Sequence, residues 1–458
     1  MENLILDGQA FLNGDEVSFH FESNILKLFF DSFMVPKKSD DKTETEDSEC
    51  QEPDYSVCVR KRGMLSGGYY LMHMETPLVE FEQAPFPHTC SRRINWYIDS
   101  FDSNAKYHEM RFRFDELNYF SPSSFKMSYS ENALVFDRSV DEILSFNLKF
   151  GTIDTTVKLV IYSNGVYGPF ASASAKTISE VRINFEPTDD YEFFYKLFLL
   201  VTDTFSFVCN RRNLTLECAD LLGTYEFEGT HPITSLLHVD DKYKEPCEES
   251  MVISKTVSYG YFKGHFGDLM QLIAGNYSED EGTVSIRGLH LSTQQRNLID
   301  LRQSLNITSA FEHHSRKYMP DISSSDTLQT YEGIKQLITE QYISTATGKK
   351  KKVAKQIVDN LRPLLSLGDK IKKAIAGYTG WEAMESIVSG RFPDWENLAG
   401  IANAWRNELA HEKREMDPNL DTIRAVRLVE HLNYAIILRQ AGYSNEQIKS
   451  ITDEVLAV

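Results

Sequence analysis

One predicted helix, over about residues 394–412, carries the side chains best suited to chemistry. Asn403, Asn407 and His411 are each four residues apart, so they share one face of that helix, and Arg406 borders this stripe. The opposite face is apolar at helical spacing and is expected to face the core, with Leu398, Ile401, Ala402, Trp405 and Leu409. We therefore expect the polar stripe to be exposed or to lie at an interface.

These residue types suit phosphodiester chemistry. A histidine titrates near neutral pH and can move a proton to or from a ribose 2′-hydroxyl or a leaving 5′-oxygen. An arginine can hold the scissile phosphate and the charge that builds up in its transition state. One Arg406 and one His411 make half a site, because in-line cleavage needs an acid and a base, and a symmetric dimer would supply the other half. The alternative is a surface helix end where both residues are incidental.

Glu312 is a further candidate site residue. It lies seven residues after Leu305 and fourteen after Leu298, which places it on the core-facing stripe of its predicted helix. A carboxylate there costs free energy unless it is paired. Either Arg406 or His411 would be a suitable partner. The alternative is that Glu312 lies at the edge of the stripe and reaches solvent.

A basic cluster lies between residues 341 and 380, where only Asp359 and Asp369 offset it. Its nine members are Lys349, Lys350, Lys351, Lys352, Lys355, Arg362, Lys370, Lys372 and Lys373. In an acidic chain, such a cluster predicts a local phosphate-binding surface that could recruit RNA. The alternative is an ordinary solvated helix face.

The chain has 458 residues and a formal net charge of −19, but the charge is unevenly distributed. Residues 1–285 hold 25 basic and 46 acidic residues (net −21), whereas residues 286–458 hold 23 and 21 (net +2). At about one domain per 150 residues, the length predicts two to three domains. The acidic residues 1–285 should repel nucleic acid, so any binding of nucleic acid is expected in residues 286–458.

The sequence excludes several other classes of protein. Six scattered cysteines do not make a disulfide framework. Residues 343–349 lack the first glycine of a phosphate-binding loop, and neither paired Cys-x-x-Cys nor His-Glu-x-x-His is present. We therefore expect no metal site and no cofactor. No signal peptide or membrane-spanning stretch is apparent either, which favours a cytoplasmic protein.

Hydrophobic periodicity predicts an α+β chain. Apolar residues alternate with polar ones at 17–21, 157–161 and 181–185, which indicates strands, and a helical pattern follows at about 191–201. The stretch 39–54 is polar and acidic and is expected to be a loop, and residues 223–285 look irregular. From about residue 292 the period is helical, with helices expected near 298–311, 326–344, 350–361, 364–376, 394–412, 420–440 and 445–456. We thus expect a β-rich domain over 1–285, a sandwich or barrel-like assembly with inserted helices, and an all-α domain over 290–458.

The run Arg406-Asn407-Glu408-Leu409-Ala410-His411 resembles the Arg–polar–x3–His signature of the HEPN ribonuclease superfamily. Residues 304–312 resemble the first long helix of the ApeA-like branch, and the β-rich front resembles the domain paired with it in ApeA-type anti-phage proteins. The resemblance implies an all-α HEPN-type bundle over 290–458 and an ApeA-like sensor or regulatory domain over 1–285.

The resemblance also implies a function. It predicts a metal-independent endoribonuclease that is active as a homodimer and leaves 2′,3′-cyclic phosphate and 5′-hydroxyl ends. Arg406 and His411 would be catalytic, with Asn407 supporting them. The role would be that of an abortive-infection effector in anti-phage defence, triggered by a phage component, with tRNA among the candidate substrates.

Two other interpretations stay open. Some HEPN domains are non-catalytic and serve as RNA-binding or oligomerisation modules, here with recognition of a phage component. Others are nucleotide-binding regulators partnered with a nucleotidyltransferase. The presence of Arg406, Asn407 and His411 together favours the catalytic interpretation.

Overall fold

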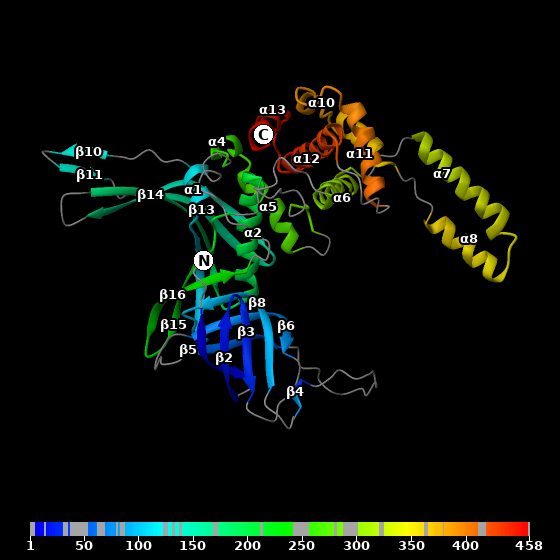
Figure 1. Ribbon diagram of the computed structural model, residues 1–458. Coiled ribbons are helices and arrows are strands. Elements are labelled where there is room, and N and C mark those ends of the chain that lie inside the picture. The colour runs from blue at the N-terminus through cyan, green and yellow to red at the C-terminus, as the bar shows by residue number, and fades with distance from the viewer. Residues whose placement is uncertain are drawn as a thin grey trace. The chain divides into compact units, whose positions relative to one another are not determined.

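Strands predominate in the N-terminal part of the chain and helices in the C-terminal part, which confirms the mixed α+β class (Figure 1). The computed structural model describes residues 5–12, 15–30, 35–36, 54–61, 69–78, 81–82, 88–121, 127–130, 133–136, 140–167, 173–210, 214–240, 256–278, 282–286, 301–319, 325–360, 365–378, 380–410 and 418–456. The chain divides into two compact units. The first comprises Met1–Ser206 and Asn213–Ser258, and the second Phe207–Arg212 and Tyr259–Val458. The loop expected at 39–54 lies almost wholly outside the described residues.

Six strands of the first unit hydrogen-bond in a closed ring, in the order β8-β3-β2-β1-β5-β6 and back to β8. They are β1 (Leu6–Leu12), β2 (Asp15–Glu22), β3 (Ile25–Phe30), β5 (Asp54–Lys61), β6 (Tyr69–Leu78) and β8 (His88–Asp99). The predicted alternation at Phe19 and Phe21 is confirmed, because both side chains are buried in the core inside this ring. Period-2 patterning therefore sets which face of each strand points inward.

The same strand β8 also borders an open antiparallel sheet, whose order is β12-β13-β14-β9-β15-β16-β8. Its other strands are β9 (Ala105–Phe112), β12 (Asp141–Phe150), β13 (Ile153–Tyr167), β14 (Ala173–Thr188), β15 (Cys218–Glu226) and β16 (Thr230–Val239). Residues 96–99 of β8 pair with β16 along one edge and with β6 along the other. The ring and the open sheet are thus joined through one strand.

Helix α2 (Tyr191–Cys209) packs on the open sheet through aromatic side chains. Phe194 meets Tyr107 of β9 edge to face at 5.5 Å between ring centroids, and Phe205 meets Phe114, which lies just after β9, in the same way at 5.0 Å. Such pairs add about 0.5–1.5 kcal/mol each beyond the burial of their surface. The remaining elements of this unit are short: α1 (Asp115–Phe120), β4 (Val35–Pro36) paired with β7 (Phe81–Glu82), and β10 (Met127–Ser130) paired with β11 (Ala133–Phe136).

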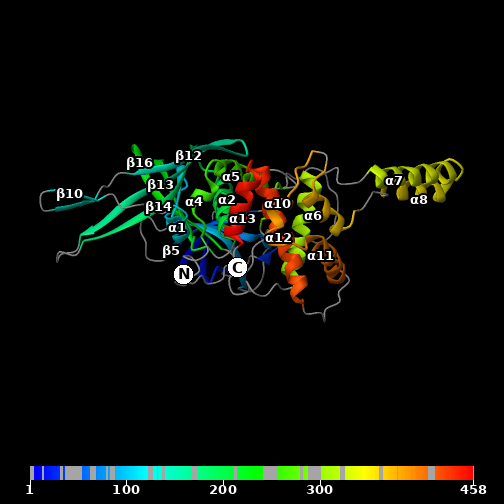
Figure 2. The ribbon, with the colours of Figure 1, turned by 90° about the horizontal axis from the view of Figure 1, so that it is seen from above.

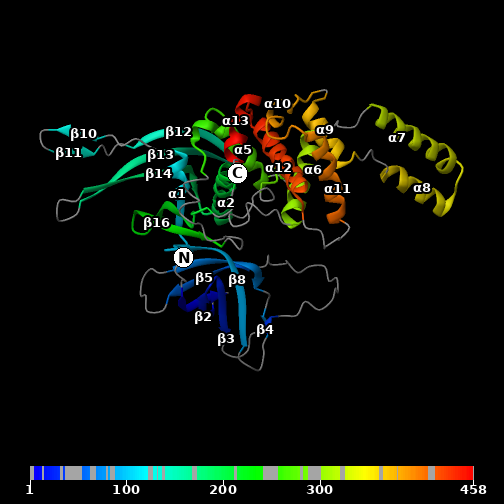
Figure 3. The same ribbon diagram turned by 45° about the horizontal axis from the view of Figure 1, so that its top comes forward.

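Helices make up the second unit (Figure 2). They are α4 (Tyr259–Phe262), α5 (Phe266–Ala274), η1 (Gly275–Tyr277), α6 (Leu301–Tyr318), α7 (Ser325–Ile338), η3 (Thr339–Ile343), α8 (Gly348–Asn360), α9 (Leu367–Ala376), α10 (Glu385–Val388), α11 (Trp395–Ala410), α12 (Leu420–Gln440) and α13 (Asn445–Val455). Helix α12 is the centre of this unit, since 14 of its 21 residues are buried. It contacts α5, α6, α10, α11 and α13. The helices α7 and α8 form a hairpin through η3 (Figure 3).

The division between the units falls earlier than the expected boundary at residue 285. Helices α4 and α5 belong to the second unit, because α4 contacts α13 and α5 contacts α12. The Tyr443 hydroxyl donates to the Phe262 carbonyl oxygen at 2.9 Å, which ties α4 to this core. The stretch 223–285, expected to be irregular, contains the strand β16 as well as α4 and α5. Short helices give too few periods for a pattern to be recognised.

Two glycines offer a matched test of the packing between α9 and α11. A Cβ on Gly368 of α9 would lie 3.0 Å from the Ala399 carbonyl oxygen, whereas one on Gly400 of α11 would meet nothing within 4 Å. We expect Gly368→Ala to lower the free energy of unfolding by about 1–3 kcal/mol, because the Ala399 backbone would have to give way by a few tenths of an ångström and cannot rotate aside as a flexible side chain can. Gly400→Ala should raise it by about 0.5–1 kcal/mol through helix propensity. Chemical denaturation monitored by circular dichroism measures both, and equal effects would contradict the close contact.

Candidate active site on the second unit

Helix α11 turns one face to the core as its spacing predicts. Leu398, Ala402 and Trp405 are buried, and Asn407 on the other side is exposed. Asn403 was expected on the exposed stripe, but it is half-buried, because α9 approaches closely at Gly368, beside Asn403. The predicted polar stripe is therefore open to solvent at Asn407 and partly covered one turn earlier. Ile401 and Leu409, expected in the core, are only half-buried.

Glu312 lies at the edge of the buried face of α6 rather than within it. The buried residues of this helix are Ser304, Ile307, Thr308, Ala310, Phe311, His314 and Ser315. These residues form the buried stripe of the helix. Leu305 and Glu312 lie beside that stripe, and both are half-buried. Leu298, which was used to place the stripe, lies outside the described residues.

Arg406 and Glu312 form an ion pair between α11 and α6. Arg406 Nη2 donates to Glu312 Oε2 at 3.1 Å, and the exposed fractions of the two side chains are 36% and 23%. Of the two partners expected for Glu312, the structure thus brings Arg406 to it. A guanidinium has five N–H donors, and within the described residues Glu312 is the only group that Arg406 contacts by hydrogen bond. The pair orients the guanidinium and, among the described residues, engages one of its five N–H donors.

Asn407 and His411 complete the sequence motif, and the structure places one of them. Asn407 is exposed beside Arg406 near the end of α11. His411 directly follows Ala410, the last residue of that helix, and lies outside the described residues. The described part of the candidate site is therefore an oriented arginine, its carboxylate and an exposed amide.

A buried polar network fixes α6 against α12, and spacing gave no sign of it. His314 Nδ1 donates to Asn433 Oδ1 at 2.8 Å, and Asn433 Nδ2 donates to the Ile307 carbonyl oxygen at 3.0 Å. The other ring nitrogen of His314 accepts from the Ser285 backbone N–H at 2.9 Å. These bonds require a neutral imidazole, and burial accordingly lowers the pKa of His314 to about 4. Because Glu312 lies two residues before His314 on α6, the network also fixes the position of Glu312 along the axis of α12.

The basic residues of the expected RNA-binding cluster divide between two helices. Lys349, Lys350, Lys351, Lys352 and Lys355 are all exposed on α8. Within the part of the chain that the structure describes, none of them lies in an ion pair. Lys372 and Lys373 lie on α9, which packs against α11, and Lys372 is exposed. Lys370 also lies on α9, so three of the cluster's residues belong to a helix that contacts α11, whereas α8 packs mainly against η3. Arg362 lies outside the described residues.

The described residues also bear on two other kinds of site, metal centres and membrane-spanning helices. Among the described residues, no group of three or more His, Cys, Asp or Glu side chains is arranged to hold a metal ion. Across the same residues, no helix has both the length and the apolar character to cross a membrane.

Acidic pH should destabilise the second unit. Burial lowers the pKa of His431 to about 3, with nearby Arg391 acting in the same direction, and His314 is lowered to about 4. Because the unfolded chain takes up these protons from about pH 6.5 downward, the free energy of unfolding should fall by about 1.4 kcal/mol per pH unit for each histidine. In the variant His431→Leu, one of the two contributions disappears. Its unfolding free energy between pH 6 and 4.5 should therefore show a shallower slope than the wild type, and an unchanged slope would contradict this assignment.

Comparison with known proteins adds no family to this geometry. No protein-family model matches the chain, and neither a curated protein nor a solved structure does. The fold and the Arg406–Glu312 pair therefore stand on the structure alone, and the likeness to HEPN ribonucleases rests on the motif in the sequence.

Proposed function

We propose that this protein is a metal-independent endoribonuclease whose helical unit is a HEPN-type domain. The observation that carries the proposal is the ion pair between Arg406 and Glu312. A partly exposed guanidinium that a carboxylate orients, with an exposed Asn407 beside it, suits the binding of a scissile phosphate. The HEPN-type motif supplies the remaining group, His411, five residues after Arg406.

Each residue has a distinct role in the proposed reaction. His411 transfers a proton at the ribose 2′-hydroxyl or at the leaving 5′-oxygen, and Arg406 stabilises the charge on the phosphate in the transition state. Attack by the 2′-oxygen on phosphorus expels the 5′-oxygen, which leaves a 2′,3′-cyclic phosphate and a 5′-hydroxyl. Glu312 positions Arg406. A second copy of the chain supplies the second proton-transfer group, so the active form is a homodimer.

The proposed biological role is that of an effector in anti-phage defence, with RNA, including tRNA, as the substrate. Exposed lysines on α8 and α9 would hold the RNA backbone. The acidic first unit would act as the sensor or regulator, in response to a phage-derived trigger. Its charge supports this division of labour, because residues 1–285 carry a net −21 and would repel RNA themselves.

Cleavage of RNA by the purified full-length chain tests the catalytic roles. Arg406→Ala and His411→Ala should each lower the cleavage rate by about 10²–10⁴-fold, because each removes a group that acts in the transition state. Arg424→Ala is the matched control, since the Arg424 side chain is also 36% exposed and also bound to a carboxylate, that of Asp394. It should cleave like the wild type. Mapping of the RNA ends should reveal cyclic phosphates.

The same variants separate the proposal from its alternative. A non-catalytic HEPN module that binds RNA and recognises a phage component predicts phage protection without RNA breaks, unaffected by Arg406→Ala or His411→Ala. Loss of protection in both variants, with folding and dimerisation retained, supports the ribonuclease. Cleavage that persists in both variants would exclude this site as the catalytic centre.

The lysines of α8 should contribute to RNA affinity and not to the chemical step. Replacing Lys349, Lys350, Lys351 and Lys352 with Gln should reduce the slope of log affinity against log salt by about 0.7 for each phosphate that is no longer neutralised. The rate at saturating RNA should stay within about twofold, since no transition-state interaction is removed. Lys335→Gln is a control in the same hairpin, because Lys335 is already bound to Glu332 at 3.3 Å. Filter binding at several salt concentrations measures the slope, and an unchanged slope would mean that RNA does not contact α8.

A further inference from the structure

The hairpin of α7, η3 and α8 has an apolar face that no described residue covers. Four side chains form it, and between 40% and 54% of each is exposed. They are Ile334 and Leu337 of α7 and Val353 and Ile357 of α8, and we call them the hairpin face. Among the described elements, only η3 and the two helices themselves pack extensively against α7 or α8. Exposed apolar side chains that gather in one place mark an interaction surface, unlike those that are scattered singly.

The two halves of the hairpin face lie on the same side of the hairpin. Ile338 of α7 is half-buried and Ala354 of α8 is buried, which marks the sides on which the two helices face each other. On each helix the exposed apolar pair is displaced from that side by about a quarter turn, in the same rotational sense. Because α7 and α8 run antiparallel (Figure 3), displacement in one sense turns both pairs to one side.

Charge is divided between the two helices of the hairpin. In the sequence, α7 and η3 together have three acidic residues and one basic residue, a net −2, whereas α8 has five lysines and one acidic residue, a net +4. Within the described part of the chain, none of the five lysines lies in an ion pair. The hairpin thus presents a negative helix and a positive helix side by side, on either side of its apolar face.

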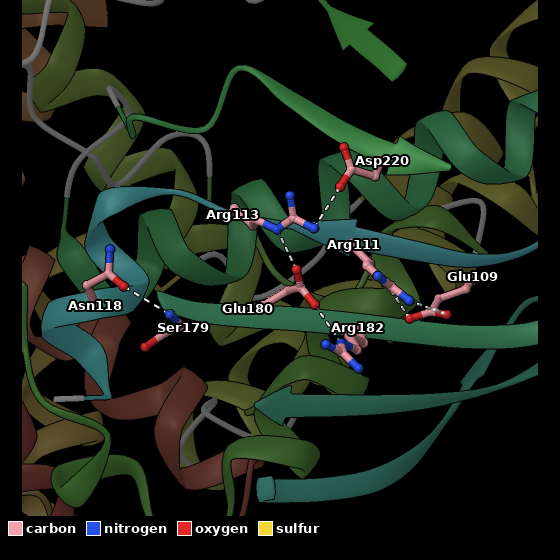
Figure 4. Close-up of polar contacts among 8 residues, drawn as sticks. All are labelled: Glu109, Arg111, Arg113, Asn118, Ser179, Glu180, Arg182 and Asp220. Atoms are coloured by element: carbon pink, nitrogen blue, oxygen red, sulfur yellow. Dashed lines mark hydrogen bonds and ion pairs between the residues drawn. The ribbon is translucent and has the colours of Figure 1, made fainter. Parts of the chain in front are cut away.

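The charged side chains on the open sheet of the first unit show the contrasting case. There Arg111 is held by Glu109, and Arg113 is held by both Glu180 and Asp220 (Figure 4). Cations and carboxylates on that surface are matched within the fold, so they call for no partner. On α8 the described residues supply no such match, and a surface with the charge of α7 would provide one.

We propose that the hairpin face packs on the same face of a second copy of the chain, with α7 of each copy over α8 of the other. A two-fold axis parallel to the helices gives this arrangement, in which four helices enclose the hairpin faces of both copies. It sets a net −2 against a net +4 at both contacts. The other two-fold arrangement would set α8 against α8, and repulsion between their lysines disfavours it.

Association through the hairpin face leaves part of α8 open to RNA. Lys351 lies two residues before Val353, and Lys355 lies two residues before Ile357, so both lysines are on the opposite side of the helix. The need for a second copy rests on the proposed function, in which a homodimer is the active form. The choice of this surface rests on the exposure and charge of the hairpin alone.

Analytical ultracentrifugation of the full-length protein without RNA tests the surface. We expect the wild type to dimerise, and Leu337→Gln and Ile357→Gln each to weaken the association at least about tenfold, because an apolar side chain is lost from the interface. Leu420→Gln is the matched control, since Leu420 is 72% exposed but lies on α12. The control should dimerise like the wild type. Far-ultraviolet circular dichroism should be unchanged in all three variants, because the replaced side chains are exposed.

Charge reversal tests the arrangement of the helices. The double variants Glu332→Lys/Glu340→Lys and Lys349→Glu/Lys352→Glu should each fail to dimerise alone, because like charges then meet at both contacts. A mixture of the two variants should form a heterodimer, since each contact again joins opposite charges. Association of the wild type should weaken as the salt concentration rises. Association that strengthens with salt would contradict the pairing of α7 with α8.

Two results would overturn the proposal. One is a wild type that stays monomeric up to about 100 µM, including one whose hairpin face binds RNA as a monomer. The other is equal dimerisation by the wild type and Leu337→Gln, which would assign the homodimer to a different surface and leave the proposed ribonuclease unaffected. Conversely, a dimer that depends on the hairpin face but cleaves no RNA would support this surface and contradict the proposed function.

Discussion

The burial of α12 is the constraint on which the second unit depends. A helix that is enclosed on nearly all sides has to find partners for its own polar groups, and Asn433 does so by bonding to His314 and to the Ile307 carbonyl oxygen of α6. These hydrogen bonds fix the position of α6 along the axis of α12, while the apolar packing of Leu398 and Ala402 fixes the position of α11. The meeting of Glu312 with Arg406 follows from these two contacts. The candidate site is therefore positioned by the core beneath it.

The second unit also shows what patterns can predict. Helical spacing placed Leu398, Ala402 and Trp405 in the core correctly, but Ile401 and Leu409, expected there too, are only half-buried. Glu312 has a charged partner as expected, although it lies at the edge of the buried face and not within it. Spacing could not choose between Arg406 and His411, because that choice depends on how α6 and α11 cross. The partial burial of Asn403 also escaped prediction, since it depends on a glycine in another helix, Gly368.

The closed ring and the central helix differ in how far they can be predicted from the sequence. Alternation at 17–21 and 181–185 identified strands, but pairing partners such as β3 with β8 are distant in sequence and leave no local signal. For α12 a signal was present: between residues 425 and 438 only Arg427 and Glu430 are charged among acidic and basic residues, which is typical of a helix buried on all sides. The capping box of Ser444 and Gln447 at the start of α13, by contrast, is a local motif that the sequence alone displays.

Closure of the ring has a consequence for how the first unit can recognise anything. Within the described residues, each of its six strands has a hydrogen-bonded neighbour on both sides, so the paired parts of the ring leave no strand edge open to an incoming peptide. The open sheet ends at β12, where Asp141, Glu142 and Lys149 place charges on the edge strand, a feature that discourages strand addition. The surfaces that the paired strands present are therefore the side chains on the sheet faces. Because those side chains do not set the backbone pairing, substitution there can change the chemistry of the surface while the fold stays the same.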